Sequence, residues 1–164
     1  MNQREVRLIF REAQSISFES LICKNIRLSE ISLSKIKSFL KESGTSFKVS
    51  KANLESFLRS LGLYEQKKIN NAGALMFASK IERFIRYSEI ILAAFKGNEK
   101  RFIYDRKDVR DDLLTQLNEA VAFIKKHLNV RSEIRGINRH DIYEIPVDAL
   151  REAILNAISI GIIA

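Results

Sequence analysis

Apolar residues recur at helical spacing in the first part of the chain. The spacing predicts three short amphipathic helices, which cover 4–15, 33–43 and the segment between Ser50 and Gly62. Ser32 and Ser50 precede the second and third helices as N-cap residues, and Gly44 and Gly62 follow them as helix stops. Each predicted helix has one apolar face, so each is expected to pack against the body of the protein.

A hairpin is predicted after these helices. Leu63-Tyr64 and Ala74–Phe77 are apolar, and the polar segment 65–73 between them suits a loop that joins two strands. Helix, helix and hairpin in this order are typical of a winged-helix module, which binds DNA. The same order also occurs as a structural subdomain of other α+β folds, so both alternatives stay open.

The second half of the chain alternates strand and helix patterns. Strands are predicted in two pairs, at 89–95 with 101–104 around Gly97-Asn98 and at 130–135 with 142–145 around the turn 136–139. A long helix with a broad apolar stripe, 108–128, separates the pairs, and a last helix has Pro146 in its first turn and runs through Ala157. The expected fold class is α+β, with a winged-helix-like helical part followed by a small mixed or antiparallel sheet and a long packing helix.

Length and composition fit one folded domain in the cytoplasm. The chain has 164 residues, of which 46% are hydrophobic and 29% are charged, and we expect a single domain with lobes at 1–78 and 79–164. No apolar stretch approaches the roughly 20 residues that cross a bilayer, and the N-terminus lacks the pattern of a signal peptide. We therefore expect no membrane partner, and the single cysteine, Cys23, should be a reduced thiol.

Charge brings in a candidate partner. The formal net charge of +8 favours polyanions, provided that the basic residues gather on one face. Five lysines on and between the second and third predicted helices are the candidate contacts to double-stranded DNA: Lys35, Lys37, Lys41, Lys48 and Lys51. The alternative, given equal weight, is that these lysines only solvate the helices.

The common catalytic patterns are absent from the sequence. His127 and His140 have no neighbouring nucleophile or cysteine partner, and no glycine-rich phosphate loop occurs. Four aspartates cluster at 105–112, where a loop and the first turn of a helix are predicted and carboxylates are favourable without a metal. We therefore expect no catalytic residue, no metal site and no enzymatic activity.

Several segments carry a family resemblance. Residues 145–157, Ile-Pro-Val-Asp-Ala-Leu-Arg-Glu-Ala-Ile-Leu-Asn-Ala, resemble the first helix of the GHKL-type ATP-binding domain in Schlafen/Alba-like transcriptional regulators, also called RecG-like helicase-related proteins. Four further segments resemble elements of the same family in the same order: Ser17–Leu21, Leu61–Leu63, Asn71–Phe77, which matches a strand, and Phe95–Gly97. The chain thus resembles the central region of this family and ends in the start of its ATP-binding domain.

The resemblance implies roles for two residues of the last helix. Glu152 matches the carboxylate that orients or activates water for ATP hydrolysis, and Asn156 matches the side chain that helps to hold Mg²⁺ on the phosphates. Their i, i+4 spacing places both on one helical face. In intact relatives, an Alba-like nucleic-acid-binding domain precedes this region and the ATP-binding fold follows it.

The last residues depart from the family pattern. Relatives continue with His-Arg-Asp-Tyr shortly after the position of Ala157, whereas this chain has Ile158–Ala164. We hypothesise a frameshift, because codons permitted for 159–164 encode His-Arg-Asp-Tyr-Ser in a shifted frame. Codons in the gene that cannot give this motif would refute the hypothesis.

Two function hypotheses follow. The first is a fragment or remnant of an ATP-binding transcriptional regulator that binds DNA or a regulatory partner without catalysis, in which Glu152 and Asn156 are vestigial and no cofactor is bound. The alternative is a protein-interaction or homodimerisation module that binds neither nucleic acid nor nucleotide, with the apolar segment 158–164 packed against a second copy.

Overall fold

The computed structural model describes residues 17–163 except 98–100 and 136–137. It has an α+β fold with a long C-terminal helix, as the hydrophobic pattern predicts. The chain divides into two compact units, of which unit 1 comprises 1–86 with 162–164 and unit 2 comprises 87–161. The break therefore follows Arg86, later than the expected boundary after Ala78, and the helix predicted at 4–15 lies outside the described residues.

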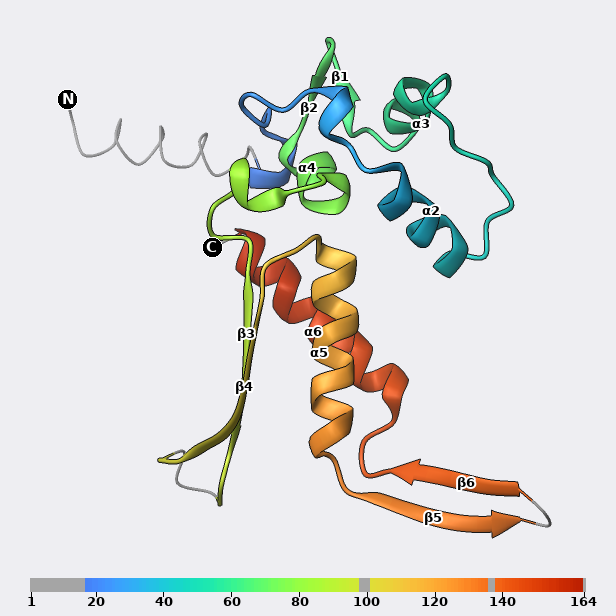
Figure 1. The fold of residues 1–164 in the computed structure, drawn as a ribbon, viewed down its shortest axis with the longest axis vertical. Helices are drawn as coiled ribbons and strands as arrows, with labels where there is room; N and C mark the ends of the chain where they lie inside the picture. The colour runs from blue at the N-terminus through green and yellow to red at the C-terminus, as the bar shows by residue number, and fades with distance from the viewer. Residues whose placement is uncertain (1–16, 98–100, 136–137, 164) are drawn as a thin grey trace, which may run out of the picture. The chain divides into compact units, whose positions relative to one another are not determined.

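Unit 1 combines short helices with one small hairpin (Figure 1). Its elements in chain order are η1 (Phe18–Ser20), η2 (Leu28–Glu30), α2 (Leu33–Glu42), α3 (Leu54–Ser60), β1 (Tyr64–Glu65), β2 (Lys68–Ile69), α4 (Asn71–Phe77) and η3 (Ile81–Arg83). The predicted order of helix, helix and hairpin is present, although each strand has only two residues.

The ends of α2 and α3 follow local signals. The Ser32 side chain accepts a hydrogen bond from the Lys35 backbone N–H as the N-cap of α2, and Gly44 follows this helix with a φ of +68°, a conformation that favours glycine. The predicted cap at Ser50 is wrong, because α3 begins at Leu54 after Asn53. The Asn53 side chain instead accepts hydrogen bonds from Ser50, which holds the preceding loop.

The predicted strand over Ala74–Phe77 is wrong, because these residues belong to α4. Asn70 caps this helix by accepting a hydrogen bond from the Gly73 N–H at 2.9 Å, and its amide donates to the Gly62 carbonyl at 2.8 Å. A short apolar run is equally compatible with a strand or a buried helix, and here the cap favours the helix.

The core of unit 1 is apolar and closely packed around α4. Its largest fully buried side chains are Ile36, Leu58, Ile69, Phe77 and Ile81. Phe77 contacts the rings of Phe39 and Phe57, with centroids 5.6 Å and 6.4 Å apart respectively. Burial of these large side chains is the main force that stabilises the unit.

Unit 2 contains two antiparallel hairpins and two long helices. Its elements are β3 (Ile90–Phe95), β4 (Ile103–Val109), α5 (Leu113–His127), β5 (Val130–Arg135), β6 (Asn138–Tyr143) and α6 (Val147–Ile163), whose last residues belong to unit 1. The β3–β4 pair has a register shift between Ala94 and Phe95. None of the helices that the structure describes is both long and apolar enough to cross a membrane.

Three predicted boundaries in unit 2 are wrong. β4 extends to Val109, where the long helix was expected to have begun, because Asp105–Val109 pair along β3. β6 begins at Asn138, before the expected strand at 142–145, because it pairs with β5 along its whole length. The last helix continues past Ala157 to Ile163.

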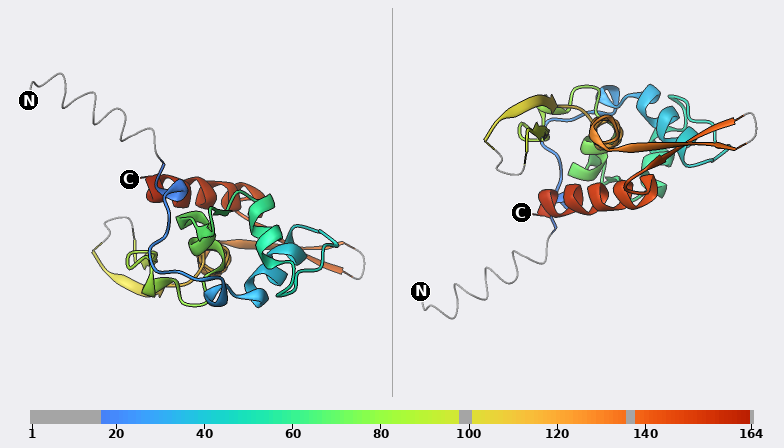
Figure 2. Two further views of the ribbon diagram at one scale, coloured as in Figure 1. Left: turned by 90° about the horizontal axis from the view of Figure 1, so that it is seen from above. Right: turned by 90° about the horizontal axis from the view of Figure 1, so that it is seen from below.

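The core of unit 2 lies on both sides of α5. Leu92 of β3 and Val109 of β4 pack in the same buried cluster as Leu117 and Val121 of α5, together with Leu150 and Ile154 of α6. Figure 2, in which α5 is seen nearly end-on and α6 from the side, shows that the two helices cross. α5 thus joins the β3–β4 hairpin to α6.

The double role of Asn70 gives a test of this fold. Asn70→Ala removes both the cap of α4 and the hydrogen bond to Gly62, so the free energy of unfolding should fall by about 1–2 kcal/mol. Asn70→Asp keeps the capping oxygen and should lose less. Urea unfolding followed by circular dichroism measures both changes, and equal losses for the two variants would contradict the role of the cap.

Candidate functional site

Lys35 takes part in the packing of unit 1. Its ammonium group donates a hydrogen bond to the Ala78 carbonyl at 2.9 Å, and the side chain is half-buried. This bond joins α2 to the residue that follows α4. Of the five candidate lysines, Lys35 therefore has a structural contact.

Lys37 and Lys41 are exposed on α2. They are one turn apart, so they lie on one face of the helix, and each follows a buried residue, Ile36 or Leu40. Lys41 in the last turn also interacts favourably with the helix dipole. This face of α2 presents two positive charges to solvent.

Lys48 and Lys51 are exposed on the loop between α2 and α3, which Figure 1 shows leading from the end of α2 back to α3. The Asn53 side chain holds this loop, because it accepts from the Ser50 N–H at 2.7 Å and donates to the Lys48 carbonyl at 2.9 Å. Val49, buried between the two lysines, anchors the loop in the core. Both charges are thus carried by a loop of defined conformation.

Glu152 and Asn156 are exposed on the same side of α6, as their spacing predicts. The opposite side carries Leu150 and Ile154, which are buried in the core of unit 2. Arg151, which precedes Glu152, donates to the Asn118 side chain on α5 at 3.4 Å. The packing of α6 therefore leaves both residues directed away from that core.

A polar cluster that the sequence did not suggest joins β4 to the end of α5. The His127 Nε2 lies 2.9 Å from a carboxylate oxygen of Asp105, and the Tyr104 hydroxyl lies 3.0 Å from Nδ1. Lys126 also donates to Asp105 at 2.8 Å. Hydrogen bonds from Lys126 and then His127 hold the pKa of the Asp105 carboxyl below its usual value.

The chemistry of this cluster is that of an oriented imidazole. Nε2–H donates to the carboxylate, so the neutral ring of His127 accepts from the Tyr104 hydroxyl through Nδ1. Phe123 packs edge-on against the same ring at 4.8 Å. These contacts fix the last turn of α5 on β4, and only the pairing of residues distant in sequence would have revealed them.

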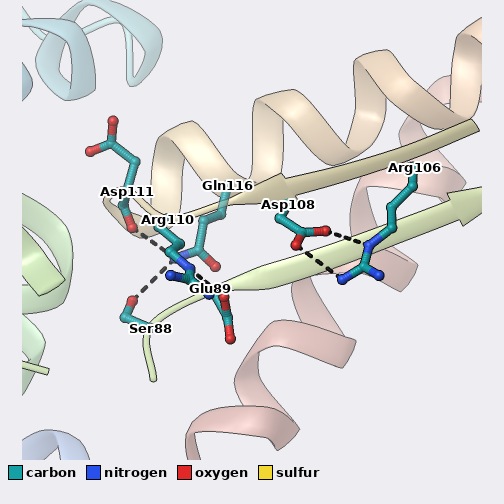
Figure 3. Close-up of polar contacts among 7 residues, drawn as sticks. All are labelled: Ser88, Glu89, Arg106, Asp108, Arg110, Asp111 and Gln116. Atoms are coloured by element: carbon teal, nitrogen blue, oxygen red, sulfur yellow. Dashed lines mark hydrogen bonds and ion pairs between the residues drawn. The ribbon is translucent and has the colours of Figure 1, made fainter. Parts of the chain in front are cut away.

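The four aspartates do not form a common site. Asp105 and Asp108 lie on β4, which corrects their expected place in a loop and a helix start, and Asp112 caps α5 by accepting from the Thr115 N–H. Arg106 bonds Asp108 through two nitrogen atoms, as Figure 3 shows, and this lowers the pKa of the Asp108 carboxyl. Within the described residues, no group of three metal-ligating side chains is present.

Two other polar groups serve the local structure. Gln116, which is buried, donates to the Ser88 hydroxyl at 3.1 Å and to the Asp111 carbonyl at 2.7 Å, both drawn in Figure 3. Cys23 is a free, buried cysteine, and burial raises the pKa of its thiol, which disfavours the reactive thiolate. Both arrangements stabilise the fold.

A hollow of about 260 Å³ lies between β4 and α5. It is lined by Asp105, Arg106, Lys107, Glu119, Ala122, Phe123 and Lys126. Lys107 pairs with Glu119 and Lys126 pairs with Asp105, so opposite charges meet across the lining. The hollow therefore does not favour a ligand of one charge.

The lowered pKa of Asp105 makes its contribution to stability depend on pH. A carboxyl whose pKa is lower in the folded state stabilises the fold above its unfolded pKa of about 3.9, and this contribution is lost as the pH falls through the folded value. Asp105→Asn should therefore unfold more easily at pH 7 and lose less stability between pH 5 and pH 2 than the wild type. Urea unfolding across this range measures the difference, and parallel curves would show that Asp105 is not responsible.

Comparison with known proteins gives a fold likeness. No family model and no curated protein matches the chain. Among solved structures, the DIP2311 protein from Corynebacterium diphtheriae is similar with a TM-score of 0.67 and 21% sequence identity over 91% of this chain. The match covers 29% of that protein, so this chain spans less than a third of its length. Such a likeness shows that the two share a fold.

Proposed function

We propose that this chain is a non-catalytic, DNA-binding part of an ATP-binding transcriptional regulator of the Schlafen/Alba-like type. The observation that carries the proposal is the exposure of Lys37, Lys41, Lys48 and Lys51 along one continuous segment of unit 1. The sequence from Lys37 to Lys51 contains one acidic residue, Glu42, so the segment is positively charged. Such a segment attracts phosphates and releases their counterions.

The arrangement of unit 1 supports duplex DNA as the partner. Two exposed lysines lie on a helix face and two lie on the loop that leads into the next helix. Phosphate contacts of this kind position a protein on a duplex without selecting a sequence. We therefore expect DNA binding that is strongly dependent on salt.

The proposal assigns no hydrolytic role to α6. By resemblance, Glu152 and Asn156 correspond to the ATP and Mg²⁺ contacts of intact relatives, and both are exposed on a single helix. A working nucleotide site would need further groups around the adenine and the phosphates, which the resemblance places in the part of the family that follows α6. In this chain the two residues are marks of ancestry.

An interaction module is the second candidate function, and one surface favours it. The β3–β4 hairpin exposes Ile91, Phe95, Phe102 and Ile103, of which Phe102 is 71% exposed. Exposed apolar side chains that gather on one hairpin are typical of contact surfaces. Sedimentation equilibrium would show a dimer if a second copy covers this surface, and Phe102→Ser with Ile103→Ser would then give a monomer.

Salt-dependent binding tests the DNA proposal. Lys37→Gln with Lys41→Gln, and separately Lys48→Gln with Lys51→Gln, should each lower duplex affinity and reduce the slope of log K against log salt by about 1.8, because two phosphate contacts are lost. Fluorescence anisotropy with a labelled duplex measures both quantities.

The control for that experiment removes the same charge elsewhere. Lys24→Gln with Lys96→Gln changes two exposed lysines outside the segment and should leave the slope nearly unchanged. Equal effects of the control and test variants would refute a localised interface. A wild-type protein that does not bind duplex DNA at low salt would refute the proposal.

The vestigial role of α6 predicts that the chain does not bind ATP measurably. Titration calorimetry with ATP and Mg²⁺ should give no saturable heat, and Glu152→Gln should behave as the wild type. Saturable binding that Glu152→Gln abolishes would instead demonstrate a working nucleotide site.

A further inference from the structure

Phe47 is an exposed aromatic residue in the basic loop of unit 1. Its side chain is 48% exposed, although its neighbours in the loop are small, polar or basic. It also lies outside the patterns that predicted α2 and α3. An aromatic ring in this position needs a physical explanation.

The ring of Phe47 is held flat against the core. It stacks on Phe57 with centroids 5.7 Å apart and an interplanar angle of 17°. Phe57 is 8% exposed and contacts the fully buried Phe77, so it forms a firm support. A ring stacked on one side and half-exposed can receive a second flat group on its other side.

Positive charge accompanies this aromatic surface. Lys48 follows Phe47 directly, and Lys51 lies on the same loop, which the Asn53 side chain closes by bonding the backbone of Lys48 and Ser50. Both lysines are exposed. A flat apolar surface beside cations matches the chemistry of a nucleotide, which joins a planar base to a phosphate.

We propose that Phe47 is a stacking platform for an unpaired base, and that the loop between α2 and α3 thereby binds single-stranded nucleic acid. Lys48 and Lys51 contact the adjoining phosphates. The inference rests on the proposed nucleic-acid binding and narrows its substrate. In a duplex the faces of the bases are covered by their neighbours, so only an unpaired base can stack on a protein ring.

Substitution of Phe47 separates stacking from charge. Phe47→Leu keeps an apolar group on Phe57 but removes the aromatic face, so affinity for a single-stranded oligonucleotide should fall about tenfold, with an unchanged salt slope. Phe47→Tyr keeps the ring and should bind as the wild type. Duplex affinity should be the same for all three proteins. Fluorescence anisotropy with labelled single-stranded and duplex DNA of the same sequence measures these affinities.

A matched control and a second probe keep the test decisive. Phe102→Leu alters an exposed phenylalanine of unit 2 and should not change binding. With the wild-type protein, a single strand that carries abasic sites should bind about tenfold more weakly than the intact strand, because its phosphates remain and its bases are missing.

Failure of this inference differs from failure of the proposed function. Equal affinity of Phe47→Leu and wild type for the single strand, or equal affinity of wild type for intact and abasic strands, would overturn the stacking role while lysine-dependent duplex binding remained. Loss of single-strand and duplex binding to the same extent would also overturn it. Absence of binding to either nucleic acid would overturn both proposals.

Discussion

Unit 1 depends on the burial of a seven-residue helix whose ends are bonded by other segments. At the start of α4, the Asn71 N–H donates to the Leu21 carbonyl and its side chain donates to the Phe18 carbonyl. At the end, the Phe77 carbonyl accepts from the Ser32 N–H and the Ala78 carbonyl accepts from Lys35. A buried helix end without such partners would be costly, so these bonds determine how the neighbouring segments lie.

The same constraint explains Gly73. A Cβ atom at this position of α4 would lie 2.8 Å from the Ile69 side chain and 3.2 Å from the Leu63 carbonyl oxygen. The backbone of the hairpin can therefore approach the helix only where a side chain is missing. β1 and β2 are so short that this contact, with the Asn70 bond to Gly62, holds the hairpin in place.

Elements with both a clear period and a local cap could be predicted from the sequence. α2 has Ser32 before it and Gly44 after it, and its expected and observed bounds nearly coincide. α4 could not be predicted, because its apolar run is too short to show a period. β4 was expected to be shorter because 105–108 are charged and disfavour strands in isolation, whereas pairing with β3 and ion pairs to α5 stabilise them here.

The candidate sites show the same limit. The exposure of Lys37, Lys41 and Glu152 follows from helical spacing, since each lies off an apolar face. The bond of Lys35 to Ala78 and the cluster of Tyr104 with His127 join residues far apart in the chain. Spacing carries no information about such contacts, so they require a structure.

The Asn53 side chain has a consequence for the thermodynamics of binding. A loop that orders only on contact with its ligand gives up part of its binding energy as lost conformational entropy. In this protein, hydrogen bonds from Ser50 and to Lys48 fix the loop before a ligand arrives, so that entropy is already lost on folding. Affinity at this loop is therefore coupled to a single amide that touches no ligand.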